Sequence, residues 1–251
     1  MLGIAKERQF FLKENFTVKR NTVLRDYIDE HRLYFIGKRI FDIAISSLII
    51  VFLLSWLLPI LAIIIKLDSS GPIFFVQRRT GFLGRSFRCF KFRTMVVNSL
   101  CDKQQATTDD PRITRLGKFL RLTSLDEMPQ FFNVLLGEMS VVGPRPHMHK
   151  DNADFARVVE NYRLRSFVKP GITGMAQVKG YRGPATDFFK IFHRYQWDAF
   201  YVRNANISLD FKIIRLTASQ IFVSLFSFAF KSDEQDEPVA PLLFAKTVPS
   251  E

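Results

Sequence analysis

The sequence lacks the short motifs with which several large enzyme classes hold a phosphate, a metal ion or a nucleophilic serine. It contains no G-x-x-x-x-G-K-[ST] loop, no G-x-G-x-x-G turn and no G-x-S-x-G elbow. Its four histidines have no zinc-protease spacing, and His147 and His149 are interpreted as surface polar residues rather than metal ligands. We therefore expect neither a P-loop NTPase, a dinucleotide-binding enzyme, a zinc protease nor an α/β-hydrolase.

Cysteine is also scarce, because the chain contains only Cys89 and Cys101. Two cysteines form no disulfide framework, which is typical of a protein kept in a reducing, intracellular setting. Cys89 lies within a run of aromatic and basic residues, so we expect its side chain to be packed rather than reactive.

Acidic residues are outnumbered by basic ones, 24 against 36, and the formal net charge is +12. Such an excess indicates an anionic partner, which could be nucleic acid, a membrane surface or a phosphorylated substrate. The segments rich in Phe and Arg would suit nucleic acid. That interpretation leaves a long apolar segment unexplained, and we expect no nucleic-acid partner.

The apolar segment covers residues 43–65 and contains 23 residues without a charge. As a helix it would be about 35 Å long, enough to cross a bilayer. It begins more than 40 residues into the chain and no small-residue cleavage site follows, so we do not expect a cleavable signal peptide. Uniform hydrophobicity over this length favours membrane insertion over a buried core helix.

Two features bear on how this segment enters the membrane. Basic residues flank it on both sides, namely Lys38, Arg39, Lys66, Arg78 and Arg79, and the positive-inside tendency favours the cytoplasmic side for both ends. Pro59 removes a helix hydrogen bond, and Ser55, four residues earlier, can satisfy the disturbed backbone. We expect a re-entrant helix-break-helix over residues 38–66 that is broken at Pro59. A spanning helix with a mild proline kink remains the alternative.

The rest of the chain predicts a mixed α/β, helix-rich fold. Residues 1–37 are an amphipathic lead-in, residues 67–230 form the globular domain, and residues 231–251 form an acidic tail that we expect to be disordered. Strands are predicted at 73–79 and 86–95. Helices are predicted at 111–124, 129–137, 151–167, 186–202 and 208–230, the last of them interfacial.

Two adjacent carboxylates, Asp126 and Glu127, stand just ahead of Pro129 in this basic chain. Ser124 and Glu127 match the S-x-x-E capping box, so the pair could merely cap a helix. Alternatively, a carboxylate can attack phosphorus to form an acyl phosphate when Arg, Lys and Mg²⁺ offset the charge. Neighbouring side chains point in different directions, which suits one acid as nucleophile and the other as metal ligand. The pattern leaves both interpretations open.

Six motifs stand in one order along the chain: KRIFDI, GPIFFVQRRTG, FKFRTM, the long segment from DPRITRLGK to VVGPRP, VKPGITGMAQVKGYRG and SLDFKIIRLT. With these motifs the chain resembles the monotopic phosphoglycosyl transferases, a bacterial sugar transferase family. The resemblance covers roughly residues 38–217, and its specificity comes from the shared order of all the motifs.

The resemblance implies roles for individual residues. Asp126 would be the nucleophile, Glu127 would bind Mg²⁺, and Pro59, with Ser55 nearby, would mark the membrane turn. Substrate or phosphate contacts are implied for Lys91, Arg93, Arg112, Arg115, Arg121, Arg145, Asp198 and Tyr201. Three positions depart from the family pattern. Leu58 replaces a usual serine, which puts the geometry of the break in question, and Ala205 and Ile207 stand where a tryptophan is common.

The implied activity is transfer of a hexose-1-phosphate from a UDP-sugar to undecaprenyl phosphate through a covalent aspartyl phosphosugar, with release of UMP. Glucose is favoured, because the linker between PRP and KPG resembles that of the hexose-transferring branch. The reaction would start exopolysaccharide or lipopolysaccharide assembly at the bacterial inner membrane, on its cytoplasmic face. Membrane lipids and a second copy of the chain are further expected partners. A catalytically silent, membrane-anchored scaffold that binds anionic lipid through its basic face remains the alternative.

Overall fold

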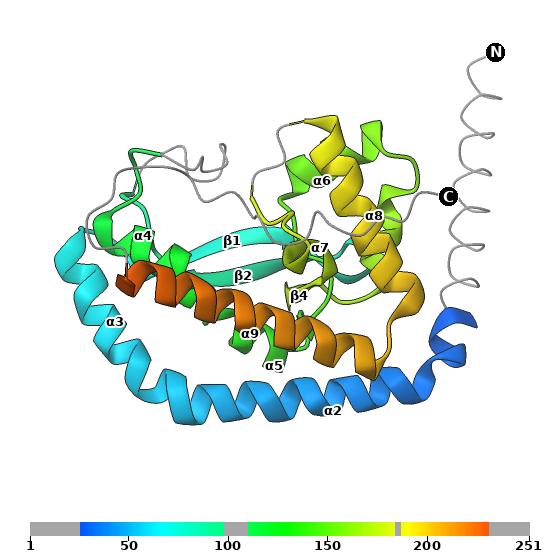
Figure 1. The fold of residues 1–251 in the computed structure, drawn as a ribbon, viewed down its shortest axis with the longest axis horizontal. Coiled ribbons are helices and arrows are strands. Elements are labelled where there is room, and N and C mark those ends of the chain that lie inside the picture. Colours follow the sequence, from blue (N-terminus) through cyan, green and yellow to red (C-terminus); the bar gives the residue numbers. More distant parts are fainter. Residues whose placement is uncertain (1–25, 98–109, 184–186, 231–251) are drawn as a thin grey trace, which may run out of the picture.

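A computed structural model describes residues 26–97, 110–183 and 187–230, with side chains described up to residue 227. The predicted acidic tail, Cys101 and most of the predicted lead-in lie outside these residues. The described part is helix-rich and contains two small sheets, in agreement with the predicted mixed α/β class. Figure 1 shows a long bent helix that curves around one side of a globular body.

The bent helix consists of α2 (Arg32–Ile49), a short π-helical segment (Ile50–Leu54) and α3 (Ser55–Asp68). Pro59 lies inside α3, so the prediction that the helix breaks at the proline is wrong. The irregular segment comes several residues earlier, where the N–H of Ser55 donates to the carbonyl of Ile50, five residues back. The Ser55 hydroxyl donates to Val51 O at 2.6 Å, as expected for a side chain that satisfies a disturbed backbone.

The outer side of the bent helix is an apolar stripe. Nearly every turn of the helix contributes an exposed apolar side chain, namely Leu33, Ile36, Ile40, Ile43, Leu48, Val51, Phe52, Trp56, Ile60, Ile63, Ile64 and Leu67. Within the described residues, one helix, Arg32–Asp68, is long and apolar enough to cross a membrane. Only 17% of its most apolar window is buried, which distinguishes it from the core helix of a globular protein.

The inner side of the same helix is fixed to the globular body near both ends. On α2, Lys38 forms an ion pair with Asp210 at 2.7 Å, and Asp42 accepts a hydrogen bond from the Val141 N–H at 2.9 Å. On α3, Leu61 and Ile65 pack in one cluster with residues that follow the membrane segment in sequence, among them Phe92 and Leu120. Both ends therefore contact the same body.

The globular body begins with an antiparallel hairpin of β1 (Phe74–Thr80) and β2 (Ser86–Phe92). Phe87 and Cys89 alternate inward on β2, so Cys89 is buried as predicted. After α4 (Arg115–Leu122) and α5 (Gln130–Leu135), β3 (Ser140–Val142) pairs in parallel with β4 (Gly171–Thr173). The remaining helices are α6 (His149–Val158), α7 (Met175–Val178), α8 (Phe188–Asn204) and α9 (Ile207–Phe230), of which α9 contacts both strands of this second sheet.

The predicted continuous helix over 151–167 is wrong. Helix α6 ends at Val158, Asn161 adopts a left-handed conformation with φ of 57°, and a 3₁₀ segment follows at Tyr162–Phe167. A left-handed residue cannot continue an α-helix, which explains the break. The other predicted helices correspond to α4, α5, α8 and α9 with shifted ends.

Candidate active site

The acid pair lies in a short 3₁₀ turn, Leu125–Glu127, between α4 and α5. Ser124 precedes it in the left-handed region with φ of 60° and makes no side-chain cap to the turn. The Ser124 hydroxyl instead accepts a hydrogen bond from Arg182 at 2.8 Å. The capping-box interpretation of Ser124 and Glu127 is therefore wrong, because a box requires that side chain to bind a backbone N–H of the helix.

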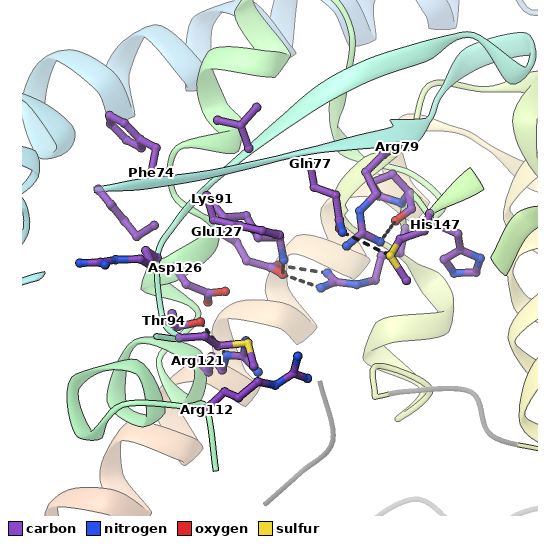
Figure 2. A pocket seen from close by; sticks show the side chains of 18 of the residues that line it. Phe74, Gln77, Arg79, Lys91, Thr94, Arg112, Arg121, Asp126, Glu127 and His147 are labelled. Atoms are coloured by element: carbon purple, nitrogen blue, oxygen red, sulfur yellow. Dashed lines mark hydrogen bonds and ion pairs between the residues drawn. The ribbon is translucent and has the colours of Figure 1, made fainter. Parts of the chain in front are cut away.

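Three cations surround the Glu127 carboxylate, which is 5% exposed. Lys91 Nζ lies 2.6 Å from Oε1, and Arg145 forms a bidentate pair with Nη2–Oε1 at 2.5 Å and Nη1–Oε2 at 3.1 Å. Arg182 is more distant, at 3.5 Å from Oε2. Figure 2 shows Lys91 and Glu127 side by side in the pocket. Such charge-assisted contacts in a buried setting hold the ionised acid firmly.

The Asp126 carboxylate differs from that of Glu127 in its contacts, although it is buried to a similar degree and is 7% exposed. Within the described residues, no hydrogen bond or ion pair holds it, while Lys91, Arg145 and Arg121 act on it through their charges. Its side chain points into the pocket above Arg121 and Arg112 in Figure 2. The pair therefore combines one fixed carboxylate with one that is free to react.

The two acids have pKa values shifted in opposite directions. Burial raises the pKa of Asp126 above its ordinary value, against the lowering effect of Lys91. Burial would also raise the pKa of Glu127, but Arg145 and Lys91 outweigh it and hold that pKa well below its ordinary value. Neighbouring titratable groups pushed apart in this way are typical of sites where two acids have different chemical tasks.

The acid pair lines a cavity of about 600 Å³ between the β1–β2 hairpin, the end of α4 and the loop around Arg145. Further cations line it. Arg121 is oriented by a hydrogen bond from Nε to the Thr94 hydroxyl at 2.8 Å, and Arg112 pairs with Asp110 at 2.5 Å. A cavity of this size, with converging cations, suits a phosphorylated small molecule.

The structure therefore brings together around one cavity seven of the residues singled out in the sequence: Lys91, Arg93, Arg112, Arg121, Asp126, Glu127 and Arg145. Arg115 is exposed at the start of α4 and does not line this cavity. Arg93 forms part of the wall, but its guanidinium donates to the carbonyls of Ile65, Ser69 and Ser70 at the end of α3. Its contacts are those of a residue that fixes the end of α3 to the globular body rather than those of a phosphate ligand.

Asp198 and Tyr201 do not line this cavity either, contrary to the prediction of direct substrate contact. Asp198 is fully buried and pairs with Arg165 at 2.8 Å. Tyr201 is also buried and donates to Asp210 at 2.7 Å. Asp198 reaches the site indirectly, because Arg165 Nη2 also donates to the Arg145 carbonyl at 2.6 Å. Asp198 is therefore a positioning residue that acts through Arg165, and Tyr201 is a packing residue.

Sequence reasoning missed Arg182 and misassigned His147. Arg182 closes the ring of cations around Glu127, and only its place in the VKGYRG motif could have indicated this. His147, interpreted above as a surface residue, is 4% exposed and lines the cavity. Burial and the charge of Arg165 hold its pKa well below the ordinary value, so the ring is neutral. Arg165 can only donate, so Nδ1 accepts from it and the proton stays on Nε2.

The residues of this site could hold Mg²⁺ only together with the phosphates of a substrate. Among the described residues, no group of three or more His, Cys, Asp or Glu side chains could enclose a metal ion. Mg²⁺ is commonly held by one or two carboxylates together with substrate phosphates. Asp126 and Glu127 match that pattern, provided that an ion at Glu127 shares the carboxylate with Lys91 and Arg145.

Comparisons with known proteins identify the family of the chain. The sequence pattern of the family described as "Bacterial sugar transferase" matches residues 33–224. A UDP-glucose:undecaprenyl-phosphate glucose-1-phosphate transferase of Klebsiella pneumoniae is 48% identical over 188 residues, which are 74% of this chain and 40% of the relative. The chain thus spans about two fifths of that protein's length.

Two shorter relatives are covered more completely. The exopolysaccharide production protein PSS of Rhizobium leguminosarum bv. phaseoli is 44% identical over 70% of this chain and 90% of its own length. A UDP-glucose:undecaprenyl-phosphate glucose-1-phosphate transferase of Caulobacter vibrioides is 37% identical over 74% of this chain and 70% of its own length.

Proposed function

This chain belongs to the bacterial sugar transferase family, and we propose that it transfers a hexose-1-phosphate, with glucose favoured, from a UDP-sugar to undecaprenyl phosphate. The names of the Klebsiella and Caulobacter relatives support the sugar and the carrier lipid. The name of the Rhizobium relative supports a role in exopolysaccharide assembly.

One observation carries the proposal: Asp126 is buried and unpaired among the described residues, while the adjacent Glu127 is held by cations. A nucleophile must be free to approach the substrate, and the charges beside it must remain when the negative phosphate arrives. Lys91, Arg145 and Arg121 satisfy the second requirement. A purely structural acid would instead have its oxygens hydrogen-bonded.

The proposed reaction has two displacements. A carboxylate oxygen of Asp126 attacks the sugar-linked phosphorus, the new O–P bond forms, and the phosphoanhydride bond breaks with its electron pair leaving on UMP. An oxygen of undecaprenyl phosphate then attacks the same phosphorus, and the aspartyl O–P bond breaks. The carboxylate is restored, and the product is a diphosphate that links the lipid to the hexose.

The cavity residues have distinct roles in this scheme. Arg145, which Glu127 holds through both of its oxygens, and Lys91 neutralise the diphosphate. Arg121, which Thr94 orients, adds a further positive charge near Asp126. Mg²⁺, when bound at Glu127, would supply further neutralisation of the phosphate oxygens. Glu127 keeps the cations in place by remaining ionised across the neutral pH range.

We further propose that the bent helix enters and leaves the membrane on the cytoplasmic face of the bacterial inner membrane. Contacts at its two ends support this, since Lys38 pairs with Asp210 and Arg93 donates to the carbonyls after Ile65. A helix that spanned about 30 Å of hydrocarbon would separate these two ends by the whole bilayer. The apolar stripe on the outer side supplies the lipid-facing surface.

Catalysis is tested by UMP release from a panel of UDP-sugars with undecaprenyl phosphate in nanodiscs. We expect release with at least one UDP-hexose, dependent on the lipid acceptor for continued turnover. If no UDP-sugar gave release while the protein still bound anionic vesicles, the scaffold alternative would replace the proposal.

The membrane arrangement is tested by cysteine accessibility at positions 36 and 68, one residue replaced at a time in a Cys101→Ser background. We expect both cysteines to react only when the cytoplasmic side is exposed to the reagent. Labelling of either cysteine from the outside would contradict the re-entrant arrangement. It would leave the proposed reaction unaffected.

A further inference from the structure

A second cavity, of about 250 Å³, is lined on one side by the first half of α2. It shares no lining residue with the cavity of the acid pair. Its apolar walls come from three separate segments that contribute Phe35, Phe82 and Phe167. Its charged lining comes from the cations Lys38, Arg39 and Lys169 and the acid Asp42. The cavity thus has aromatic walls and an excess of cations.

Two of these cations converge on one point. A Cβ atom placed on Gly137 would lie 3.5 Å from Arg39 Nη2 and 3.6 Å from Lys169 Nζ. Arg39 is held there because it donates to the carbonyls of Val134 and Leu135 at the end of α5, at 2.6 and 2.9 Å. Within the described residues, the Lys169 amine has no hydrogen bond or ion pair. Burial and the nearby charge of Arg39 lower its pKa.

The acids near this cavity have other partners. Asp42 accepts hydrogen bonds from the Ser140 hydroxyl and the Val141 N–H, at 3.0 and 2.9 Å. Asp210 pairs with Lys38. The charge of Asp42 offsets part of the repulsion between Arg39 and Lys169, but within the described residues neither cation forms an ion pair with a carboxylate. A bound anion would relieve the remaining repulsion.

The cavity is also at a particular depth. Arg39 precedes by only a few residues the uncharged segment that begins at Ile43, so it belongs at the level of the lipid headgroups. On the opposite face of the same helix, Leu33 and Ile40 are 87% and 64% exposed, which suits contact with lipid. One face of α2 therefore meets lipid while the other lines the cavity.

We propose that this cavity binds the headgroup of an anionic phospholipid, with its phosphate between Arg39 and Lys169 and its glycerol and upper acyl carbons against the phenylalanines. The assignment rests on the membrane placement proposed above and not on sugar transfer. Binding would reach the catalytic site through α5, because Arg39 holds the end of α5 and the acid pair stands just before its start. The chain would then work best where anionic lipid is present.

The first test measures the reactivity of Lys169 in the full chain. The protein is placed in nanodiscs of phosphatidylcholine alone or mixed with phosphatidylglycerol and treated with acetic anhydride at about pH 8, where a lysine of lowered pKa is preferentially neutral. Acetylation is quantified by peptide mass spectrometry. Lys66, which is exposed at the other flank of the apolar segment, is the depth-matched control.

We expect phosphatidylglycerol to lower Lys169 acetylation about tenfold relative to Lys66, as a pKa rise of one unit would do. Equal acetylation in both lipid mixtures would overturn the proposal, whether because the cavity is closed or because the rest of the chain covers it. Protection of the same size by inorganic phosphate in pure phosphatidylcholine would overturn the lipid assignment in favour of a free anion.

A second test counts retained lipid. Native mass spectrometry of the protein released from mixed nanodiscs should show one phosphatidylglycerol fewer for Lys169→Gln than for the parent, and no loss for Lys66→Gln. Undiminished retention in Lys169→Gln would contradict the proposed site. Because neither readout uses UMP release, failure here leaves the proposed catalytic function standing, and the converse also holds.

Discussion

The region around the acid pair and the region where α8 meets α9 both bury carboxylates among cations, but they balance charge differently. In the α8–α9 region, Asp198 receives two hydrogen bonds from Arg165, and Asp210 receives bonds from Lys38, Tyr34 and Tyr201. Each carboxylate there has its own partners. Such matched groups hold elements together and leave nothing for a ligand.

In the acid-pair region, by contrast, the cations outnumber the acids, and all of their direct contacts with the pair are made with one of the two carboxylates. Glu127 takes contacts from Lys91, Arg145 and Arg182, whereas Asp126 has none among the described residues. The surplus positive charge and the unpaired acid are costly in an empty site. A diphosphate at this place would offset the surplus charge, which is why we propose that the substrate binds here.

The largest effect should come from Asp126→Asn. Removing the nucleophile should reduce UMP release by at least about 10⁴-fold, as loss of an attacking group does in other enzymes. Intact-protein mass spectrometry of the parent with UDP-sugar and no acceptor should show an added hexose phosphate, and the variant should show none. A variant that retained turnover would return Asp126 to a structural role.

Asp198→Asn should instead cost stability. The substitution leaves buried Arg165 without its counter-charge, and breaking such a pair typically costs about 3–5 kcal/mol. Urea unfolding in detergent measures the loss. Asp187→Asn is the matched control on the same helix, because that residue is half-exposed at the start of α8 and Asn also caps well. Equal stability of the two variants would show that the buried Asp198–Arg165 pair does not stabilise the fold.

Arg145→Ala should lower UMP release about 10²- to 10³-fold, as loss of one electrostatic donor typically does. Membrane association should be unchanged, because no apolar surface is lost. Arg145→Lys keeps the charge but not the bidentate geometry, so its activity should lie between the parent and the alanine variant. Turnover of the alanine variant within about threefold of the parent, far from that typical loss, would show the assignment to be wrong.

Arg182→Ala should have a smaller effect. The side chain is 43% exposed and lies 3.5 Å from Glu127, so solvent screens its charge. We expect kcat/KM to fall about tenfold, equivalent to about 1.4 kcal/mol. Arg163→Ala removes an exposed arginine of the neighbouring 3₁₀ segment and should leave kcat/KM unchanged. A loss at Arg182 as large as that at Arg145 would mean that the phosphate sits closer to Arg182.

The smallest expected effect is a gain in stability. Burial raises the pKa of Asp126, so the folded protein loses stability as the pH rises through that raised value. Asp126→Asn removes this dependence. Thermal unfolding should show the variant to be more stable than the parent at neutral pH, with the difference vanishing below about pH 4, the ordinary range of an aspartic acid. A less stable variant at neutral pH would indicate that the carboxylate is held after all.

The sequence by itself determined the helix-rich class and the family, and it predicts the membrane segment and the role of the acid pair. These properties depend on local signals: an uncharged run of sufficient length, a hairpin with alternating apolar residues, and motifs in a fixed order. The same signals could not locate the bend. Pro59 was the visible helix breaker, yet the irregular turn lies earlier, in residues with no distinguishing composition.

Only the tertiary structure decided which charged residues line the cavity of the acid pair. Arg93, Asp198 and Tyr201 carry the right chemistry at motif positions, but they are committed to α3, Arg165 and Asp210 respectively. Arg182, more than 50 residues beyond the acid pair, is brought beside Glu127 by the fold. A motif fixes which charges are present, whereas the role of each depends on the distances between side chains and on burial, which arise only when remote segments pack together.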